Sequence, residues 1–105
     1  MRPTITARHC EISEALRERA VTVVQRLGNL ASRTMESTVV FDTDATQQIA
    51  EIRLHVPRGE VLVARGEAAD HRTALDRAEE RLRRQLERVA DRPRRARSAP
   101  TDNTI

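Results

Sequence analysis

Residues 50–56, AEIRLHV, alternate strictly between apolar and polar side chains, which is the period of a β-strand with one buried face. The positions expected to point inward are Ala50, Ile52, Leu54 and Val56. PRG at 57–59 has the composition of a turn, and EVLVARG at 60–66 predicts a second strand, so the two strands form a hairpin. This hairpin constrains the fold because its apolar face has to be covered by another layer.

Two further segments have strand character. Residues 35–42, MESTVVFD, are rich in residues that favour strands. Residues 2–9 alternate weakly, with Ile5 and Ala7 on one side, and Pro3 fits at the start or at an edge of that strand. The chain therefore supplies four strands.

Two segments carry apolar residues at helical spacing. Ser13 is expected to cap the first helix and Gly28 to end it. Asp70 is expected to cap the second helix, and Pro93 to end it within a residue or two. The apolar stripes consist of Leu16, Ala20, Val23, Val24 and Leu27 in the first helix, and of Leu75, Ala78, Leu82, Leu86 and Val89 in the second.

The order of elements, βαβββα, predicts an α+β fold: a two-layer domain with a four-stranded mixed sheet and both helices packed on one of its faces. The first βαβ unit is expected to be a right-handed crossover, so that strands one and two are parallel if they are neighbours and the other pairs antiparallel. A chain of 105 residues has room for one core and one site. We expect the folded domain to span residues 1–92, and residues 93–105 to form a disordered basic tail.

The positive charge is concentrated in the last third of the chain. Residues 70–97 contain ten arginines against six acidic residues, whereas residues 1–69 contain nine of each sign. Because a helix advances about 100° per residue, several arginines of the second helix form one ridge beside its apolar stripe. The ridge consists of Arg77, Arg81, Arg84 and Arg88, extended by Arg92. Such a ridge favours phosphate binding, since the planar guanidinium fork donates two hydrogen bonds at once.

The alternative is a helix face that is merely solvated, as most charge runs are. Against it, the acidic residues lie largely on the other flank, with Glu80 and Arg84 as the closest pair, whereas a helix built for solubility would interleave its charges. In the first helix, Arg19 and Arg26 share one flank and Arg17 lies on the other. If the two helices lie side by side, the two sets of arginines could form the banks of a groove.

Catalytic and metal-binding constellations are not apparent, so we expect no enzyme activity, no cofactor, no metal site and no small-molecule substrate. His9, His55 and His71 are far apart in sequence, and Cys10 is the only cysteine. Phe41 is the only aromatic ring, so recognition of RNA would depend on backbone and shape rather than on stacking of bases. With no signal-peptide pattern and no apolar run of about 18 residues, we expect a cytoplasmic protein without a membrane partner.

Two segments together carry a resemblance to a known family. The first is EISEALRE, Glu11–Glu18, followed by Arg26 and Leu27 where the family has a basic residue and a leucine. The second is ALDRAEERLRRQLER, Ala74–Arg88, which is similar to the family's pattern of alanine, aliphatic and aspartate, then basic, leucine, any residue, arginine, glutamine, leucine, any residue and basic. From about residue 5 to residue 92 the sequence resembles the short ribosome hibernation promoting factors, also called ribosome-associated inhibitor A or protein Y, and sigma-54 modulation proteins in many genomes.

The resemblance implies a protein that binds the rRNA of the small ribosomal subunit in the channel between head and body, where messenger RNA and transfer RNAs lie. It implies inhibition of translation in stationary phase or under stress. The implied rRNA-binding residues are Arg17 and Arg26 in the first helix and Arg81, Arg84, Arg88 and Arg92 in the second, to which the ridge geometry adds Arg77. The separate C-terminal domain by which long members dimerise is not expected.

Three positions depart from the family pattern. Val23 stands where relatives often carry lysine, and His71 and Arg72 replace a methionine and a tyrosine ahead of the second helix. These departures bear on local contacts and on affinity rather than on the fold. The competing interpretation is a protein-binding regulatory module, either a transcription-associated modulator or a domain that self-associates through a sheet edge or an exposed sheet face.

Overall fold

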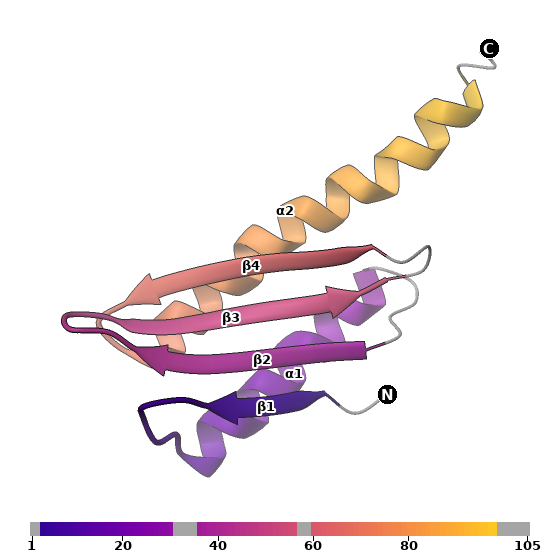
Figure 1. Cartoon of the computed structure of the whole chain (residues 1–105). Coiled ribbons are helices and arrows are strands. Elements are labelled where there is room, and N and C mark those ends of the chain that lie inside the picture. The colour runs from indigo at the N-terminus through magenta and orange to yellow at the C-terminus, as the bar shows by residue number, and fades with distance from the viewer. Residues whose placement is uncertain (1–2, 31–35, 57–59, 99–105) are drawn as a thin grey trace.

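A computed structural model describes residues 3–30, 36–56 and 60–98, with side chains through residue 88. The elements are β1 (Thr4–Ala7), α1 (Glu14–Leu30), β2 (Glu36–Thr43), β3 (Gln48–His55), β4 (Val61–Ala68) and α2 (His71–Ser98). The strands form one sheet in the order β1-β2-β3-β4, and both helices lie against the same face of it (Figure 1). The predicted element order and two-layer α+β fold are confirmed.

Strand pairing follows the expected pattern. β1 pairs with β2 in parallel, with Ile5 opposite Val39, and the pairs β2–β3 and β3–β4 are antiparallel. The helix α1 connects the two parallel strands across the covered face, as a βαβ unit requires. The turn predicted at 57–59 lies outside the described residues. The strands β1 and β4 are the edges of the sheet.

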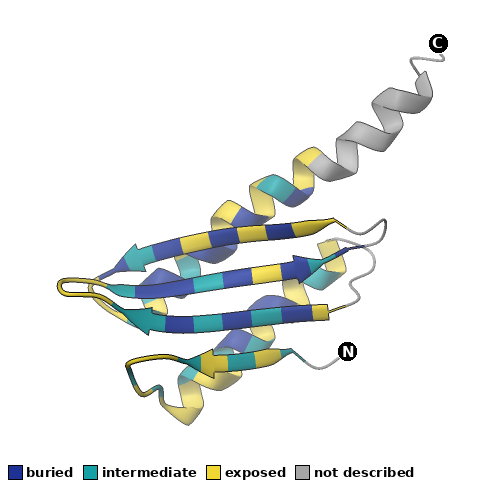
Figure 2. Cartoon of the chain, in the orientation of Figure 1, coloured by how far each residue is buried: buried dark blue, intermediate teal, exposed yellow. Residues whose placement is uncertain are grey.

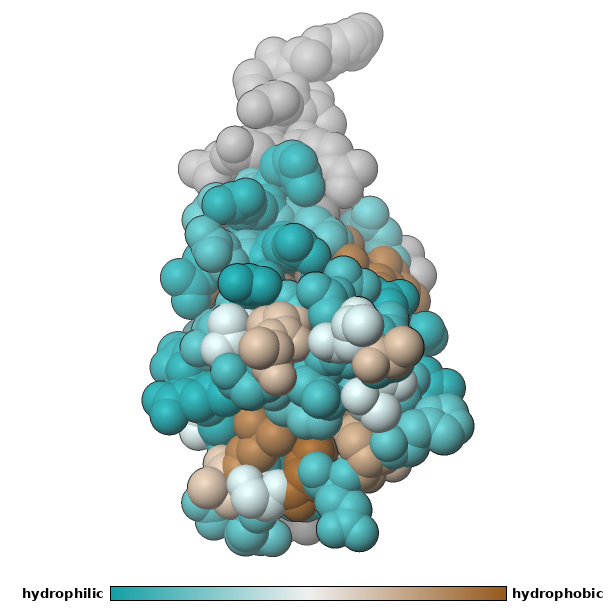
Figure 3. All heavy atoms as spheres, turned by 90° about the vertical axis from the view of Figure 1, so that its left-hand side faces the viewer, coloured by the Kyte–Doolittle hydropathy of each residue, from teal (hydrophilic) through white to brown (hydrophobic). Residues whose placement is uncertain are grey.

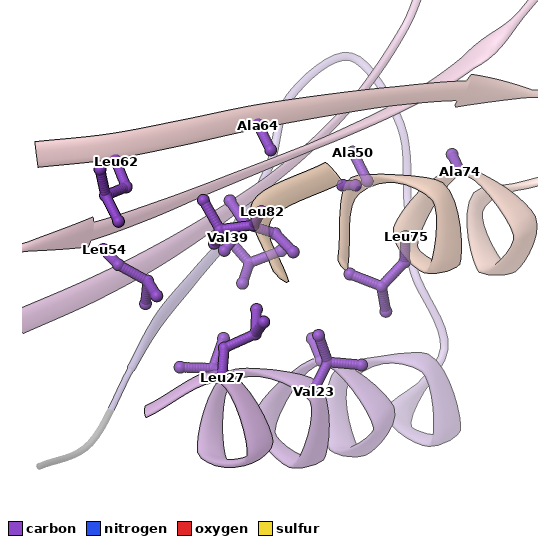
Figure 4. Close-up of a cluster of buried hydrophobic side chains, with 14 of the residues drawn as sticks. Val23, Leu27, Val39, Ala50, Leu54, Leu62, Ala64, Ala74, Leu75 and Leu82 are labelled. Atoms are coloured by element: carbon purple, nitrogen blue, oxygen red, sulfur yellow. The ribbon is translucent and has the colours of Figure 1, made fainter. Parts of the chain in front are cut away.

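The core lies between the sheet and the two helices. Along β2, β3 and β4, buried residues alternate with more exposed ones (Figure 2), and the inward positions predicted from 50–56 are all buried. Val23 and Leu27 of α1 point toward Leu75 and Leu82 of α2 and toward the sheet (Figure 4), and all four are fully buried. The predicted stripes therefore face the core, except that the side chain of Val89 lies outside the described part.

Both helix starts are capped as predicted. The backbone N–H of Leu16 donates to the Ser13 hydroxyl at 3.0 Å, and the N–H of Thr73 donates to the Asp70 carboxylate at 2.8 Å. Each cap satisfies a backbone donor that has no partner within the helix. The caps also fix where the two helices begin on the covered face.

Both predicted helix ends are wrong. The helix α1 continues past Gly28 to Leu30, because a glycine inside a helix costs only about 1 kcal/mol and buried Leu27 holds the last turn against the core. The helix α2 continues past Pro93 to Ser98. A proline costs about 3 kcal/mol inside a helix, but the residues that follow it here, RRAR, are good helix formers. Residues 99–105 lie outside the described part, and a domain boundary after residue 92 stays a prediction.

Candidate nucleic-acid interface

The arginine ridge of α2 lies on the flank that faces the β4 edge and the solvent. Four of its members, Arg77, Arg81, Arg84 and Arg88, are exposed. The side chain of Arg92, the fifth predicted member, lies outside the described residues. Arg77, Arg81, Arg84 and Arg88 therefore lie together on one flank of α2, as the sequence predicts.

Three side chains of α2 donate hydrogen bonds to outward-facing backbone carbonyls of β4. The pairs are Arg77 with Glu67 at 2.6 Å, Arg81 with Arg65 at 2.5 Å and Gln85 with Val63 at 2.8 Å. These bonds cover acceptors that an edge strand otherwise leaves open to another chain. Each guanidinium has five N–H donors, so Arg77 and Arg81 keep most of theirs for a second acceptor.

The outer part of the ridge, Arg84 and Arg88, makes fewer contacts within the described part of the protein. Arg84 pairs with Glu80 at 3.0 Å, but their side chains are 68% and 66% exposed, and such an exposed pair contributes only a few tenths of a kcal/mol. Within the described part of the chain, Arg88 has neither a hydrogen-bond nor an ion-pair partner. Arg84 and Arg88 are therefore the ridge residues most available to an anionic ligand.

The arginines of α1 do not form a second bank opposite the ridge. Arg19 and Arg26 face the acidic flank of α2, where Arg19 pairs with Asp76 at 2.8 Å and Arg26 pairs with Glu79. The ridge lies on the opposite flank of α2. The expectation of a groove between two banks of arginines is therefore wrong. The basic flank of α1 and the acidic flank of α2 meet at the contact between the two helices, the α1–α2 seam.

Glu79 is the residue of this region that sequence reasoning missed. It is only 7% exposed, and it accepts hydrogen bonds from Nε of Arg26 at 3.0 Å, from Nη2 of Arg26 at 3.1 Å and from Arg83 at 3.4 Å. The hydrogen bonds to Glu79 raise the pKa of the Arg26 guanidinium above its ordinary value. Its position was visible in principle, since it follows buried Leu75 by four residues, one turn of helix.

Arg17 lies apart from the other predicted residues. It is exposed on the far flank of α1, and its Nη1 donates to the backbone carbonyl of Ile5 in the edge strand β1 at 3.4 Å. The seven predicted residues thus divide between the ridge on α2, the seam at Arg26 and the β1 edge at Arg17. A ligand that contacted all of them would have to extend across the helical layer.

The open face of the sheet has a different electrostatic character. On β3 and β4, two arginines of this face are paired within it, Arg53 with Glu51 and Arg65 with Glu67, both at 3.1 Å. Exposed Val63 lies next to these pairs. Arg53 and Arg65 therefore offer a phosphate backbone less unbalanced positive charge than the ridge does.

Other kinds of site find little support in the described residues. No group of three or more His, Cys, Asp and Glu side chains in the part that the structure describes could hold a metal ion. Nor does that part contain a helix long and apolar enough to cross a membrane. An open pocket of about 520 Å³ lies between the helix starts, near Ser13, Arg19 and Asp70, at the mainly hydrophilic end of the molecule shown in Figure 3. Of its polar groups, Arg19 pairs with Asp76, His71 hydrogen-bonds the backbone carbonyl of Asp42, and Ser13 and Asp70 serve as helix caps.

The comparisons with known proteins agree with this fold. The crystal structure of the Thermus thermophilus protein Y N-terminal domain superposes with a TM-score of 0.74 and 29% identity, covering 85% of this chain and 99% of that one. A ribosomal subunit interface protein from Coxiella burnetii gives a TM-score of 0.79 over 87% of this chain and 99% of that one, at 22% identity, which bears on the fold alone.

Curated relatives point the same way. A ribosome hibernation promoting factor from Salmonella typhimurium is 35% identical over 91 residues, covering 87% of this chain and 95% of the relative. One from Pseudomonas putida is 30% identical over 88 residues, covering 84% and 85%.

The fold and these relatives define a class of noncatalytic ribosome-binding proteins that regulate translation. Residues 4–94 match the family described as sigma 54 modulation protein / S30EA ribosomal protein, and the chain belongs to this family. The resemblance seen in the sequence is thereby confirmed.

Proposed function

We propose that this chain is a ribosome hibernation factor that binds the rRNA of the small ribosomal subunit in the channel for messenger and transfer RNA. In this role it inhibits translation in the cytoplasm under stress or in stationary phase. The proposed rRNA contacts are Arg17, Arg26, Arg77, Arg81, Arg84, Arg88 and Arg92. Relatives that are named ribosome hibernation promoting factors support the ribosome as the target.

The observation that carries the proposal is the unequal pairing of arginines on the two sides of the molecule. On the sheet face, Arg53 and Arg65 are paired with acids, whereas on the ridge Arg88 has no partner among the described residues and Arg84 only an exposed one. Successive ridge positions lie about 5–6 Å apart, so neighbouring guanidinium groups can contact successive phosphates. The helical layer is therefore the side that attracts a polyanion.

The test compares two double variants of equal charge. Arg84→Gln with Arg88→Gln removes two positive charges from the ridge, and Arg53→Gln with Arg65→Gln removes two from the open sheet face. We expect the ridge variant to bind purified small subunits about tenfold more weakly or worse, since each charge-assisted hydrogen bond contributes about 1.5 kcal/mol or more. The sheet variant should co-sediment with the subunits nearly as the wild type does.

Two outcomes would contradict the proposal. Equal losses in both variants would mean that net charge rather than a defined surface drives the association. A wild-type chain that ignores small subunits at low salt would favour the protein-binding regulatory module instead. Circular dichroism of each variant serves as the control for folding.

A further inference from the structure

We propose that Glu79 is a positioning residue for RNA binding, which holds the Arg26 guanidinium at the α1–α2 seam in the orientation in which it meets a phosphate. This inference rests on the proposed function and adds a residue to it. Glu79 acts through Arg26 and, to a smaller extent, through Arg83.

The burial of Glu79 is the first argument. Its side chain is 9% exposed, whereas that of its neighbour Glu80 is 66% exposed. A carboxylate in such a place is unfavourable unless it is paired and hydrogen-bonded, and apolar residues of similar size often stabilise a fold as well. Stability alone therefore does not explain a charge at this position.

The geometry of the pair is the second argument. Arg26 uses Nε and one Nη2 hydrogen on the two carboxylate oxygens, at 3.0 and 3.1 Å, which fixes the plane of the guanidinium. Its Nη1 amino group and the other Nη2 hydrogen remain free of this pair. The side chain of Arg26 is 49% exposed and that of Arg83 is 45% exposed. One buried carboxylate thus holds two half-exposed cations, and the cluster keeps a net positive charge.

The fixed orientation matters because an arginine side chain has many rotamers, and immobilising it on binding costs free energy. A guanidinium that is already held in the free protein avoids most of that loss. The negative charge of Glu79 has the opposite effect, since it weakens attraction to phosphate. Charge and positioning therefore predict opposite results when Glu79 is neutralised, which makes the two roles separable.

The experiment compares Glu79→Gln with Glu80→Gln. Each variant removes one negative charge from α2, and the two positions are adjacent in sequence. Glu80→Gln should bind small subunits as tightly as the wild type or more tightly. Glu79→Gln should bind about threefold to tenfold more weakly than Glu80→Gln, as expected for the loss of one or two preordered side chains. Thermal unfolding of both variants confirms that they are folded at the assay temperature.

A double-mutant cycle with Arg26→Gln separates positioning from general stability. If Glu79 acts through Arg26, most of the effect of Glu79→Gln should disappear when Arg26 is already glutamine. A purely structural role would lower the unfolding temperature in both backgrounds and leave no such coupling in affinity. If Glu79→Gln does not fold, Arg26→Lys keeps the charge but loses the two-point pair, and it should also weaken binding about threefold to tenfold.

The outcomes separate this inference from the proposed function. A wild-type chain that does not bind small subunits overturns the proposed function itself. If the wild type binds small subunits and Glu79→Gln binds them as tightly as Glu80→Gln or more tightly, only the positioning role is overturned. If Glu79→Gln does not fold, Arg26→Lys takes its place, and an affinity of Arg26→Lys equal to that of the wild type also overturns the positioning role.

Discussion

Gly66 of β4 decides how closely the arginine-bearing helix approaches the sheet. A Cβ atom at this position would lie 2.1 Å from the carbonyl oxygen of Ala74 and 2.7 Å from the backbone nitrogen of Ala78. It would also lie 3.0 Å from Cβ of the ridge residue Arg77. Since backbone atoms of a packed helix cannot move aside cheaply, only glycine allows this approach.

We predict that Gly66→Ala destabilises the domain by about 2 kcal/mol or more, because overpacking against backbone forces α2 away from β4. The free energy of unfolding in urea measures this loss. Ala69→Val, which adds methyl groups at an exposed position just past β4, is the control and should stay within about 0.5 kcal/mol of the wild type. A wild-type unfolding midpoint for Gly66→Ala would show that α2 is not held against Gly66.

The Asp70 carboxylate makes stability depend on pH at the start of α2. The backbone N–H of Thr73, followed by the Thr73 hydroxyl, lowers the pKa of Asp70 below its ordinary value. A carboxylate whose folded pKa is lowered stabilises the protein above the unfolded pKa of about 3.9, and this contribution disappears as the pH falls through the folded pKa.

Asp70→Asn keeps a capping oxygen but does not titrate. We predict that the wild type is more stable than this variant at pH 7 and that the difference shrinks when the pH falls below about 4. Urea unfolding of both proteins at pH 7 and pH 3 measures the difference. A difference of the same size at both values would mean that Asp70 is not linked to acid unfolding.

At the scale of elements, the arginine-bearing flank of α2 also covers the edge of the sheet. Its side chains Arg77, Arg81 and Gln85 donate to successive outward carbonyls of β4. Edge strands with open carbonyls readily add a strand of another chain, and covering them prevents this. The same flank therefore protects the edge and presents positive charge.

Replacing Arg77, Arg81 and Gln85 together by alanine should uncover the β4 edge and increase self-association. Sedimentation velocity over a range of concentrations measures this, and we expect the apparent mass of the triple variant to rise more steeply than that of the wild type. Arg84→Ala with Arg88→Ala removes charge without uncovering a carbonyl and is the matched control. If both variants self-associate alike, loss of charge repulsion rather than an open edge is the cause.

At the scale of the whole molecule, the arginines of the two layers differ in their pairing. Arg53 and Arg65 on the open sheet face are paired with acids, whereas Arg88 on the ridge of α2 has no partner among the described residues. Binding to rRNA through such a layer releases counterions, so the affinity should fall with salt by a slope of about −0.7 to −0.9 for each phosphate contact in a plot of log affinity against log salt.

We predict that Arg88→Ala removes one phosphate contact and so reduces the magnitude of this slope by about 0.7 to 0.9. Arg53→Ala should leave the slope unchanged. Co-sedimentation with small subunits at a series of salt concentrations gives the slope. Equal slopes for Arg88→Ala and the wild type would remove Arg88 from the interface while leaving the family assignment intact.

Local patterns in the chain predicted most of the fold. Alternation at 50–56, helical spacing around Leu27 and Leu82, and the caps at Ser13 and Asp70 each report on a neighbourhood of a few residues. The same logic failed at the helix ends, because one glycine or one proline weakens a helix by a few kcal/mol at most and the residues around it can outweigh that cost.

The sequence by itself determined which faces of the helices and of the hairpin strands carry the apolar residues and that arginines share one flank of α2, because periodicity is a property of each element alone. Only the tertiary structure decided which flanks meet. Arg26 and Glu79 lie 53 residues apart, and no local pattern in either helix reports the partner of the other. Both helices pack against the same sheet, and this packing places Glu79, at the edge of the apolar stripe of α2, where its carboxylate accepts hydrogen bonds from Arg26.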